Sequence, residues 1–133
     1  MNNSDNFSNQ RDSGSVIKIL FIRAPKENHD ALVKIGKQTD LFYKKHGVSK
    51  SVYKMNARED IMDFVSLSKV ISASDDEDVW LEILSYRDIN HVQEVMKALE
   101  GDKMGNELYT EAMELITPGS IVFGDFSKLE ETP

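Results

Sequence analysis

Residues that could bind or transform a small molecule occur at alternate positions in two hydrophobic segments of the chain. Lys18 lies in the first segment, and Trp80, Glu82 and Tyr86 lie in the second. Residues two apart in a β-strand point to the same face of a sheet, so Trp80, Glu82 and Tyr86 are predicted to share one face. If the segments are neighbouring strands, Lys18 and Glu82 can form an ion pair that orients a ligand or transfers a proton.

These side chains have two interpretations. In the first, they are ligand-binding candidates that line a small cavity with aromatic walls. In the second, Lys18 and Glu82 pair across strands within a dimer interface, and Trp80 and Tyr86 pack beside them. Because ion pairs that serve structure alone are common, the second interpretation is preferred to the first.

The alternation also predicts which face of the sheet carries these residues. Helices that cover a sheet pack on its apolar positions, so Lys18, Trp80, Glu82 and Tyr86 are predicted to point away from the helices. A register error of one residue would exchange the two faces. The positions predicted to face the helices are Ile17, Ile19, Phe21, Val79, Leu81 and Ile83.

His46 is a further ligand-binding candidate, at the end of an apolar helical stripe and just before Gly47. At a helix end an imidazole is favoured by the helix dipole or donates to a free carbonyl, so capping is preferred to catalysis. His29 and His91 stand near predicted helix starts without other ligands at metal spacing. A histidine-based metal site is therefore not expected.

Several other chemistries are excluded by what the sequence lacks. The chain has no cysteine, which excludes disulfides, thiolate metal sites and thiol nucleophiles. The acidic run at residues 75–78 lacks the glycine and spaced oxygen ligands of a calcium loop, so it is predicted to be a solvated turn. There is no glycine loop for phosphate and no nucleophile elbow. We expect no cofactor and no metal.

The charge of the chain also limits its partners. A net charge of −7 over 133 residues disfavours nucleic acid and anionic membranes, which bind clustered Lys and Arg. The nearest approach to a basic patch is predicted to be solvated: Lys44, Lys45, Lys50 and Lys54. No run of about 18 apolar residues is present, and a cytoplasmic location is expected.

Hydrophobic periodicity places these residues in an ordered series of elements. Asn28 is predicted to cap a helix that Gly47 ends, and Asp88 is predicted to cap a second helix that ends at Gly101. The segment 56–70 has no clear pattern. The predicted strands are residues 16–24, 48–55, 79–86 and 121–126, with a further short helix at about 106–116.

This order predicts an α+β fold of the ferredoxin-like βαββαβ kind, with both helices on one face of a four-stranded antiparallel sheet. The first and third strands are neighbours in that fold, and the second is predicted to lie at an edge because it is less hydrophobic. One domain is expected at residues 16–127, between a disordered N-terminal tail, 1–15, and a C-terminal tail, 128–133.

Short motifs at several points of the chain resemble a known family, the domain of unknown function 1428 family, a branch of the dimeric α+β barrel superfamily. The resemblance covers about residues 16–127. Asp125, Trp80 and Ile83 depart from it, since the family tends to have glycine, a small aliphatic residue and tryptophan there. It rests on Pro25, Lys26, Asn28, Lys45, His46 and Gly47, on the strand from Glu77 into Arg87, and on Ile121, Val122, Phe123, Gly124 and Phe126.

The resemblance implies a homodimer in which two sheets face each other, and it implies no established activity. Relatives in the superfamily include cofactor-free monooxygenases, haem-degrading enzymes and isomerases, so the fold alone cannot select a reaction. The leading hypothesis is a homodimeric protein that binds a small apolar or aromatic molecule, with monooxygenase- or isomerase-like activity in the barrel cavity as its catalytic form. The alternative is a non-catalytic oligomeric or regulatory module.

Overall fold

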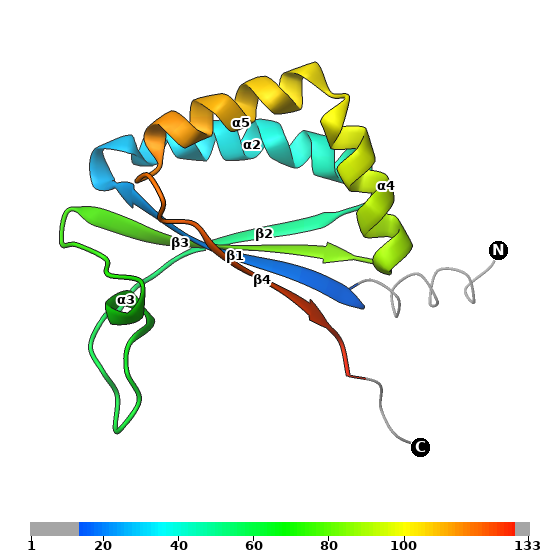
Figure 1. The fold of residues 1–133 in the computed structure, drawn as a ribbon. Coiled ribbons are helices and arrows are strands. Elements are labelled where there is room, and N and C mark those ends of the chain that lie inside the picture. Colours follow the sequence, from blue (N-terminus) through cyan, green and yellow to red (C-terminus); the bar gives the residue numbers. More distant parts are fainter. Residues whose placement is uncertain (1–13, 130–133) are drawn as a thin grey trace.

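Four antiparallel strands form one sheet in the order β2-β3-β1-β4, and helices cover one of its faces (Figure 1). The computed structural model describes residues 14–129. No helix in this part of the chain is long and apolar enough to cross a membrane. The strands are β1 (Val16–Pro25), β2 (Ser49–Lys54), β3 (Glu77–Tyr86) and β4 (Val122–Ser127), and the helices are η1 (Lys26–Asn28), α2 (His29–Lys45), α3 (Leu67–Val70), α4 (Ile89–Glu100) and α5 (Lys103–Leu115).

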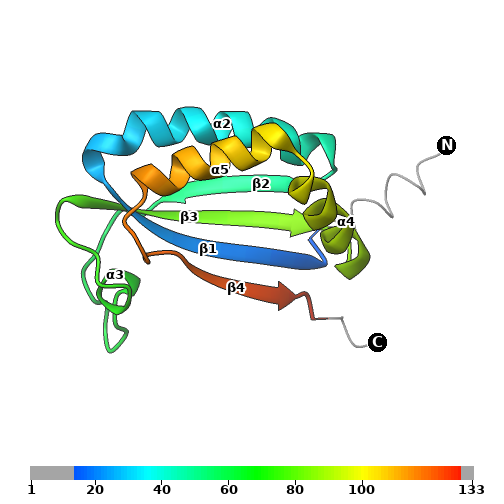
Figure 2. The ribbon, with the colours of Figure 1, turned by 45° about the horizontal axis from the view of Figure 1, so that its top comes forward.

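This arrangement confirms the predicted ferredoxin-like fold. Strand β2 lies at an edge and β1 pairs with β3, as expected. Helices α2 and α5 lie side by side above the sheet, and α4 packs at one end of it (Figures 1 and 2). The outer parts of the predicted tails, residues 1–13 and 130–133, lie outside the described residues. Inside them, the amide of Gly14 donates to Tyr86 O at 3.2 Å.

Local side chains determine where the helices begin and end. Asp88 caps α4 as predicted, because its Oδ1 accepts from the amide of His91 at 2.7 Å. Gly47 follows α2 with φ +75°, a conformation that glycine adopts without strain. The predicted capping bond of Asn28 is wrong. Its side-chain amide instead donates to Leu115 O at 2.9 Å, which joins the start of α2 to the end of α5.

The faces of the sheet are exchanged relative to the prediction. Leu84 and Tyr86 are buried in a core with Val92 and Val95 of α4, and Trp80 stacks on His29 of α2. Trp80, Glu82, Leu84 and Tyr86 therefore face the helices, and so does Lys18, which pairs with Leu84. The prediction failed because the helix-covered side carries the charged Lys18 and Glu82, and the more apolar side, which was assigned to the helices, is the uncovered one.

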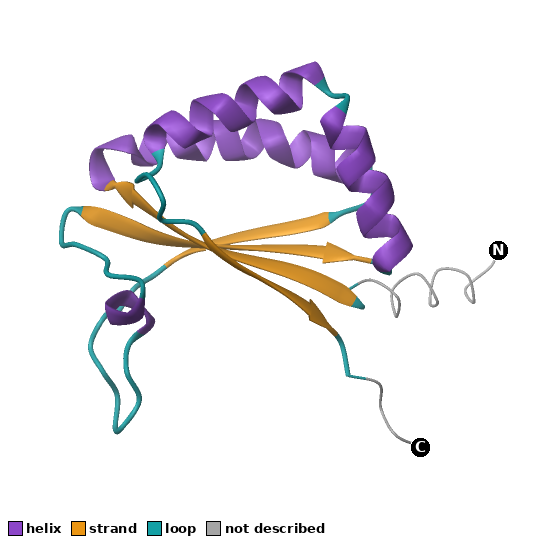
Figure 3. Ribbon diagram, in the orientation of Figure 1, coloured by secondary structure: helices purple, strands orange, loops and turns teal. Residues whose placement is uncertain are grey.

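The opposite side of the sheet, called here the open face, is mainly apolar, with Ser49, Ser51 and Ser85 as polar positions on β2 and β3. The segment between β2 and β3, which had no clear sequence pattern, lies on this side and contains α3 (Figure 3). Arg58 fastens it to the start of β3, since its guanidinium donates to Ser74 O at 2.8 Å and also to Glu77 O. Strand pairing assigns to the open face Ile17, Ile19, Phe21, Tyr53, Leu81, Ile83, Val122 and Phe126.

Candidate functional site

Glu82 lies near the centre of the helix-facing side of the sheet. It is paired with Leu20 on β1 and with Val52 on β2. Burial raises the pKa of the Glu82 carboxyl, and the nearby positive charge of Lys50 only partly opposes this shift. A carboxyl group with a raised pKa beside a cation is a typical feature of acid–base sites, although structural sites share it.

Lys50 is held against α2 and is not solvated as the sequence had predicted. Its Nζ donates to Thr39 Oγ1 at 2.7 Å and to Gly36 O at 3.0 Å. It also lies 6.0 Å from the centre of the Tyr43 ring. These contacts fix an ammonium group whose positive charge acts on the Glu82 carboxyl.

Two tyrosines complete the surroundings of Glu82. Burial, together with the negative charge of Glu82, raises the pKa of Tyr43 to about 12. Burial also raises the pKa of Tyr86, and the nearby Tyr43, Glu82 and Asp125 act in the same direction. Both phenols therefore stay protonated at neutral pH and are able to donate hydrogen bonds.

The predicted ion pair between Lys18 and Glu82 is wrong. Lys18 lies opposite Leu84, one pair along the ladder from Glu82. Within residues 14–129, the carboxylate that approaches its Nζ is that of Asp125 on β4, at 3.6 Å. Lys18 and Glu82 share a face, but each has a different charged neighbour.

The helices leave the β4 side of this face accessible. Figure 2 shows β4 lying clear of α2 and α5, and Phe123, which faces the helix side, is 67% exposed. Phe123 is paired with Leu20, which in turn is paired with Glu82. The row of paired residues Phe123, Leu20 and Glu82 therefore runs from the exposed β4 side toward the buried carboxyl, and we call its outer end, at Phe123, the β4 opening.

The two hollows on the helical side of the protein do not lie at the Glu82 site. One of about 520 Å³ lies along α5, and another of about 410 Å³ lies between α2 and α5. Neither is lined by Glu82, Lys50 or Tyr43. In the described part of the chain, no group of three or more His, Asp or Glu side chains is arranged to hold a metal ion.

His46 lies apart from the other ligand-binding candidates, which are all on the strands of the sheet. It is the C-cap residue of α2, and its ring packs on Phe42 at 4.5 Å between centroids. Its carbonyl oxygen lies 2.7 Å from Nε2 of His91, a residue that the sequence analysis set aside. His91 is 3% exposed, and its Nδ1 accepts from the Arg87 amide at 3.0 Å. Both ring nitrogens therefore serve structure, with Nε2 donating to His46 O.

A largely buried ion pair, between Arg23 and Glu77, was missed because the sequence placed Glu77 in a solvated turn. Glu77 begins β3 and is 6% exposed. Arg23 Nη1 donates to both of its carboxylate oxygens at 2.9 Å. Burial disfavours the charged form, but bonds from the Ser74 amide, Thr117 and Arg23 outweigh it and lower the pKa of Glu77 to about 2.

The fold and site define an α+β protein of the ferredoxin-like kind with a partly buried cluster of Glu82, Lys50 and Tyr43. Residues 16–115 match the family described as Protein of unknown function (DUF1428), and the chain belongs to that family. This confirms the resemblance found in the sequence. No curated protein matches the chain.

The chain is similar to two solved structures. The chain is similar to a mutant of SnoaB, a cofactor-independent oxygenase from Streptomyces nogalater, with a TM-score of 0.54 and 11% identity over 90% of this chain and 98% of that one. It is also similar to the de novo designed protein Foldit4, with a TM-score of 0.49 and 11% identity over 86% of this chain and 98% of the design. At such identity, the SnoaB likeness supports the fold alone.

Proposed function

We propose that this protein binds a small organic molecule at the β4 opening and that Glu82 exchanges a proton with it. The observation that carries the proposal is the raised pKa of a partly buried carboxyl beside a fixed ammonium group. A general base acts best when its pKa lies near the working pH. Burial raises the pKa of Glu82 toward neutral pH, which is the direction that a general base requires.

The neighbours of Glu82 support an isomerase-like reaction. The carboxylate would remove a proton from a carbon next to a carbonyl group, and the resulting enolate would be stabilised by the charge of Lys50. Protonated Glu82 would then return the proton to a different carbon, so no co-reactant is consumed. Cofactor-free oxygenation begins with the same proton removal and in addition consumes dioxygen.

The open face supports a homodimer as the working unit. Tyr53, Val122 and Phe126 are each about half exposed, at 56%, 49% and 52%, and their neighbours on β1 and β3 are also apolar. Contiguous apolar surfaces of this kind mark association sites. A second copy of the same sheet would bury this surface on both subunits.

A thermal-shift screen with quinones, haem, flavin, aromatic acids and ketones tests ligand binding. A compound that binds only the folded state raises the melting temperature. For a ketone that binds, proton NMR in deuterated water then measures exchange of the protons next to the carbonyl group. We expect exchange to depend on protein and to be lost in Glu82→Gln, while the exposed Glu94→Gln on α4 keeps it.

The non-catalytic module is the second candidate, and a specific observation favours it. Lys18 and Lys50 already have partners, Asp125 for the first and Gly36 with Thr39 for the second. A purely structural role needs nothing more. If no compound raises the melting temperature and Glu82→Gln leaves a stable dimer, this second candidate is correct.

A further inference from the structure

Two buried polar atoms without hydrogen-bond partners lie in residues that stack on each other beside Glu82. They are Nε1 of Trp80 and Nδ1 of His29. The two rings are 5.3 Å apart between centroids, with 27° between their planes. Buried polar groups in folded proteins are nearly always hydrogen-bonded, and since no described protein group bonds to these two atoms, both can bond to a ligand.

Asp78 adds a charged group to the same place. Its Oδ2 lies 3.7 Å from His29 Nδ1, which is too long for a hydrogen bond, and the residue is 9% exposed. Asp78 and Trp80 are two residues apart in β3 and share the helix-facing side. We call His29, Asp78 and Trp80 the Trp80 cluster.

The three groups of the Trp80 cluster select one ligand chemistry. The indole N–H can only donate, the carboxylate can only accept, and a neutral imidazole nitrogen does one or the other. A hydroxyl group satisfies them because it accepts from Trp80 and donates to His29 or Asp78. A ketone can accept from Trp80 but has no hydrogen to donate to Asp78, and a carboxylate would be repelled by Asp78.

We infer that the Trp80 cluster is a recognition subsite for a hydroxyl group of the ligand, an inference that rests on the proton-transfer function proposed for Glu82. Trp80 and Glu82 are two residues apart on the same face of β3, which is roughly 7 Å along a strand. One six-membered ring with a substituent spans this distance. The ligand class is therefore a hydroxylated ring compound whose hydroxyl lies at Trp80 and whose reactive carbon lies at Glu82.

Trp80 is the sole tryptophan of the chain, so its fluorescence reports the subsite directly. The probes are cyclohexanol, cyclohexanone and cyclohexanecarboxylate, which share a ring and do not absorb where indole is excited. We expect cyclohexanol to change the emission of Trp80 and to bind about 3- to 10-fold more tightly than the ketone, the range for one buried hydrogen bond. The carboxylate is expected to bind most weakly.

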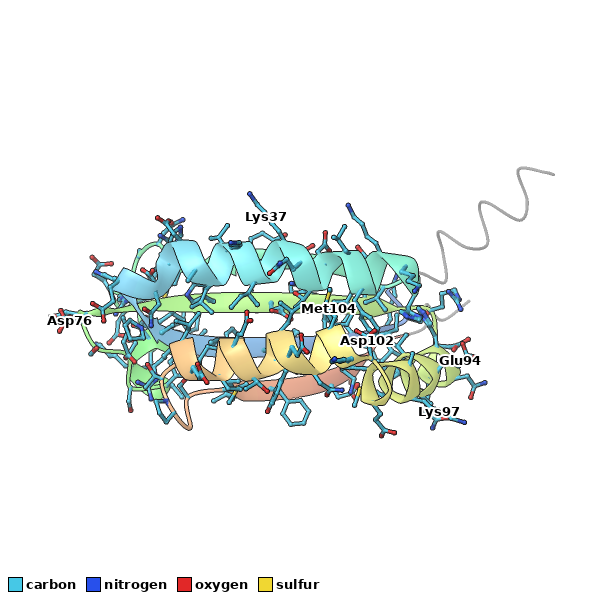
Figure 4. The ribbon with its side chains drawn as sticks, turned by 90° about the horizontal axis from the view of Figure 1, so that it is seen from above. Lys37, Asp76, Glu94, Lys97, Asp102 and Met104 are labelled. Atoms are coloured by element: carbon cyan, nitrogen blue, oxygen red, sulfur yellow. The ribbon has the colours of Figure 1, made fainter. Side chains whose placement is uncertain are left out.

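Variants of the cluster identify the groups responsible. Asp78→Asn removes the charge and keeps the shape, so it should bring the carboxylate and the alcohol to similar affinities. His29→Phe keeps the stacked ring and should reduce the preference for the alcohol. The control is Asp76→Asn, because Asp76 is exposed and lies at the outer end of the molecule in Figure 4. It should leave all affinities unchanged.

The outcomes separate this inference from the function proposed for Glu82. The preference for alcohol should persist in Glu82→Gln, even though proton exchange is lost there. Equal affinities for the three probes, or no change in Trp80 emission with cyclohexanol, would overturn the subsite while leaving exchange at Glu82 to its own test. A crystal soaked with cyclohexanol that contains only a water molecule at Trp80 Nε1 would also overturn it.

Discussion

Replacement of Glu77 by glutamine should lower stability at neutral pH and have little effect in acid. The carboxylate of Glu77 accepts from Arg23, Thr117 and the Ser74 amide, and its pKa is lowered from 4.5 to about 2. This difference corresponds to about 3 kcal/mol at 1.36 kcal/mol per pKa unit. Solvent screening near the end of the sheet reduces the expected contribution to about 2 kcal/mol.

The pH range of the effect follows from the direction of the shift. Because folding lowers the pKa of Glu77, its contribution is fully present above pH 4.5 and is lost as the pH falls toward 2. Wild type should therefore exceed Glu77→Gln by about 2 kcal/mol in free energy of unfolding at pH 7. The two proteins should approach each other between pH 4.5 and 2.

Urea unfolding followed by circular dichroism at pH 7, 5, 4 and 3 measures this difference. Other carboxyl groups titrate over the same range, but they do so in both proteins and cancel in the comparison. Glu94→Gln on the exposed side of α4 provides the matched control and should follow wild type. A difference between wild type and Glu77→Gln that stays constant from pH 7 to pH 3 would refute the reasoning.

Further predictions concern His91 in α4, Gly47 after the end of α2, and the open face. His91→Ala should lower the free energy of unfolding by about 2–4 kcal/mol, since it removes the hydrogen bonds of both imidazole nitrogens and leaves a cavity. Chemical unfolding measures this change, and a loss below about 1 kcal/mol would contradict the prediction. Gly47→Ala should cost about 1 kcal/mol because of φ +75°, and an unchanged melting temperature would argue against that. Ile83→Lys on the open face should convert a dimer to monomer in sedimentation equilibrium, and an unchanged mass would exclude this surface as the interface.

The sequence was sufficient for the order of elements because periodicity is local. The caps of α4 and the turn at Gly47 depend on residues a few positions apart, as the bond from the His91 amide to Asp88 illustrates. The faces of β3 could not be assigned in the same way. Val79, Leu81 and Ile83 form the more apolar side, whereas Glu82 interrupts Trp80, Leu84 and Tyr86 on the other, so hydrophobicity indicated the wrong side.

The site residues were partly predictable for a related reason. Trp80, Glu82 and Tyr86 were grouped correctly because side chains alternate along a strand. The partner of Lys18 depends on the register between β1 and β3, which pairs it with Leu84 and not with Glu82. The ion pair between Arg23 and Glu77 joins residues that are 54 positions apart in the chain. Contacts between such distant residues leave no local sequence pattern.

The most direct test of the account is the titration of the Glu82 side-chain carboxyl by carbon-13 NMR, with Glu82→Gln used to assign its signal. The account predicts a midpoint above the ordinary value of 4.5, because burial disfavours the charged form more than Lys50 favours it. A midpoint at or below 4.5 would show that the site does not raise the pKa of Glu82. That result would contradict the proposed role of Glu82 in proton exchange.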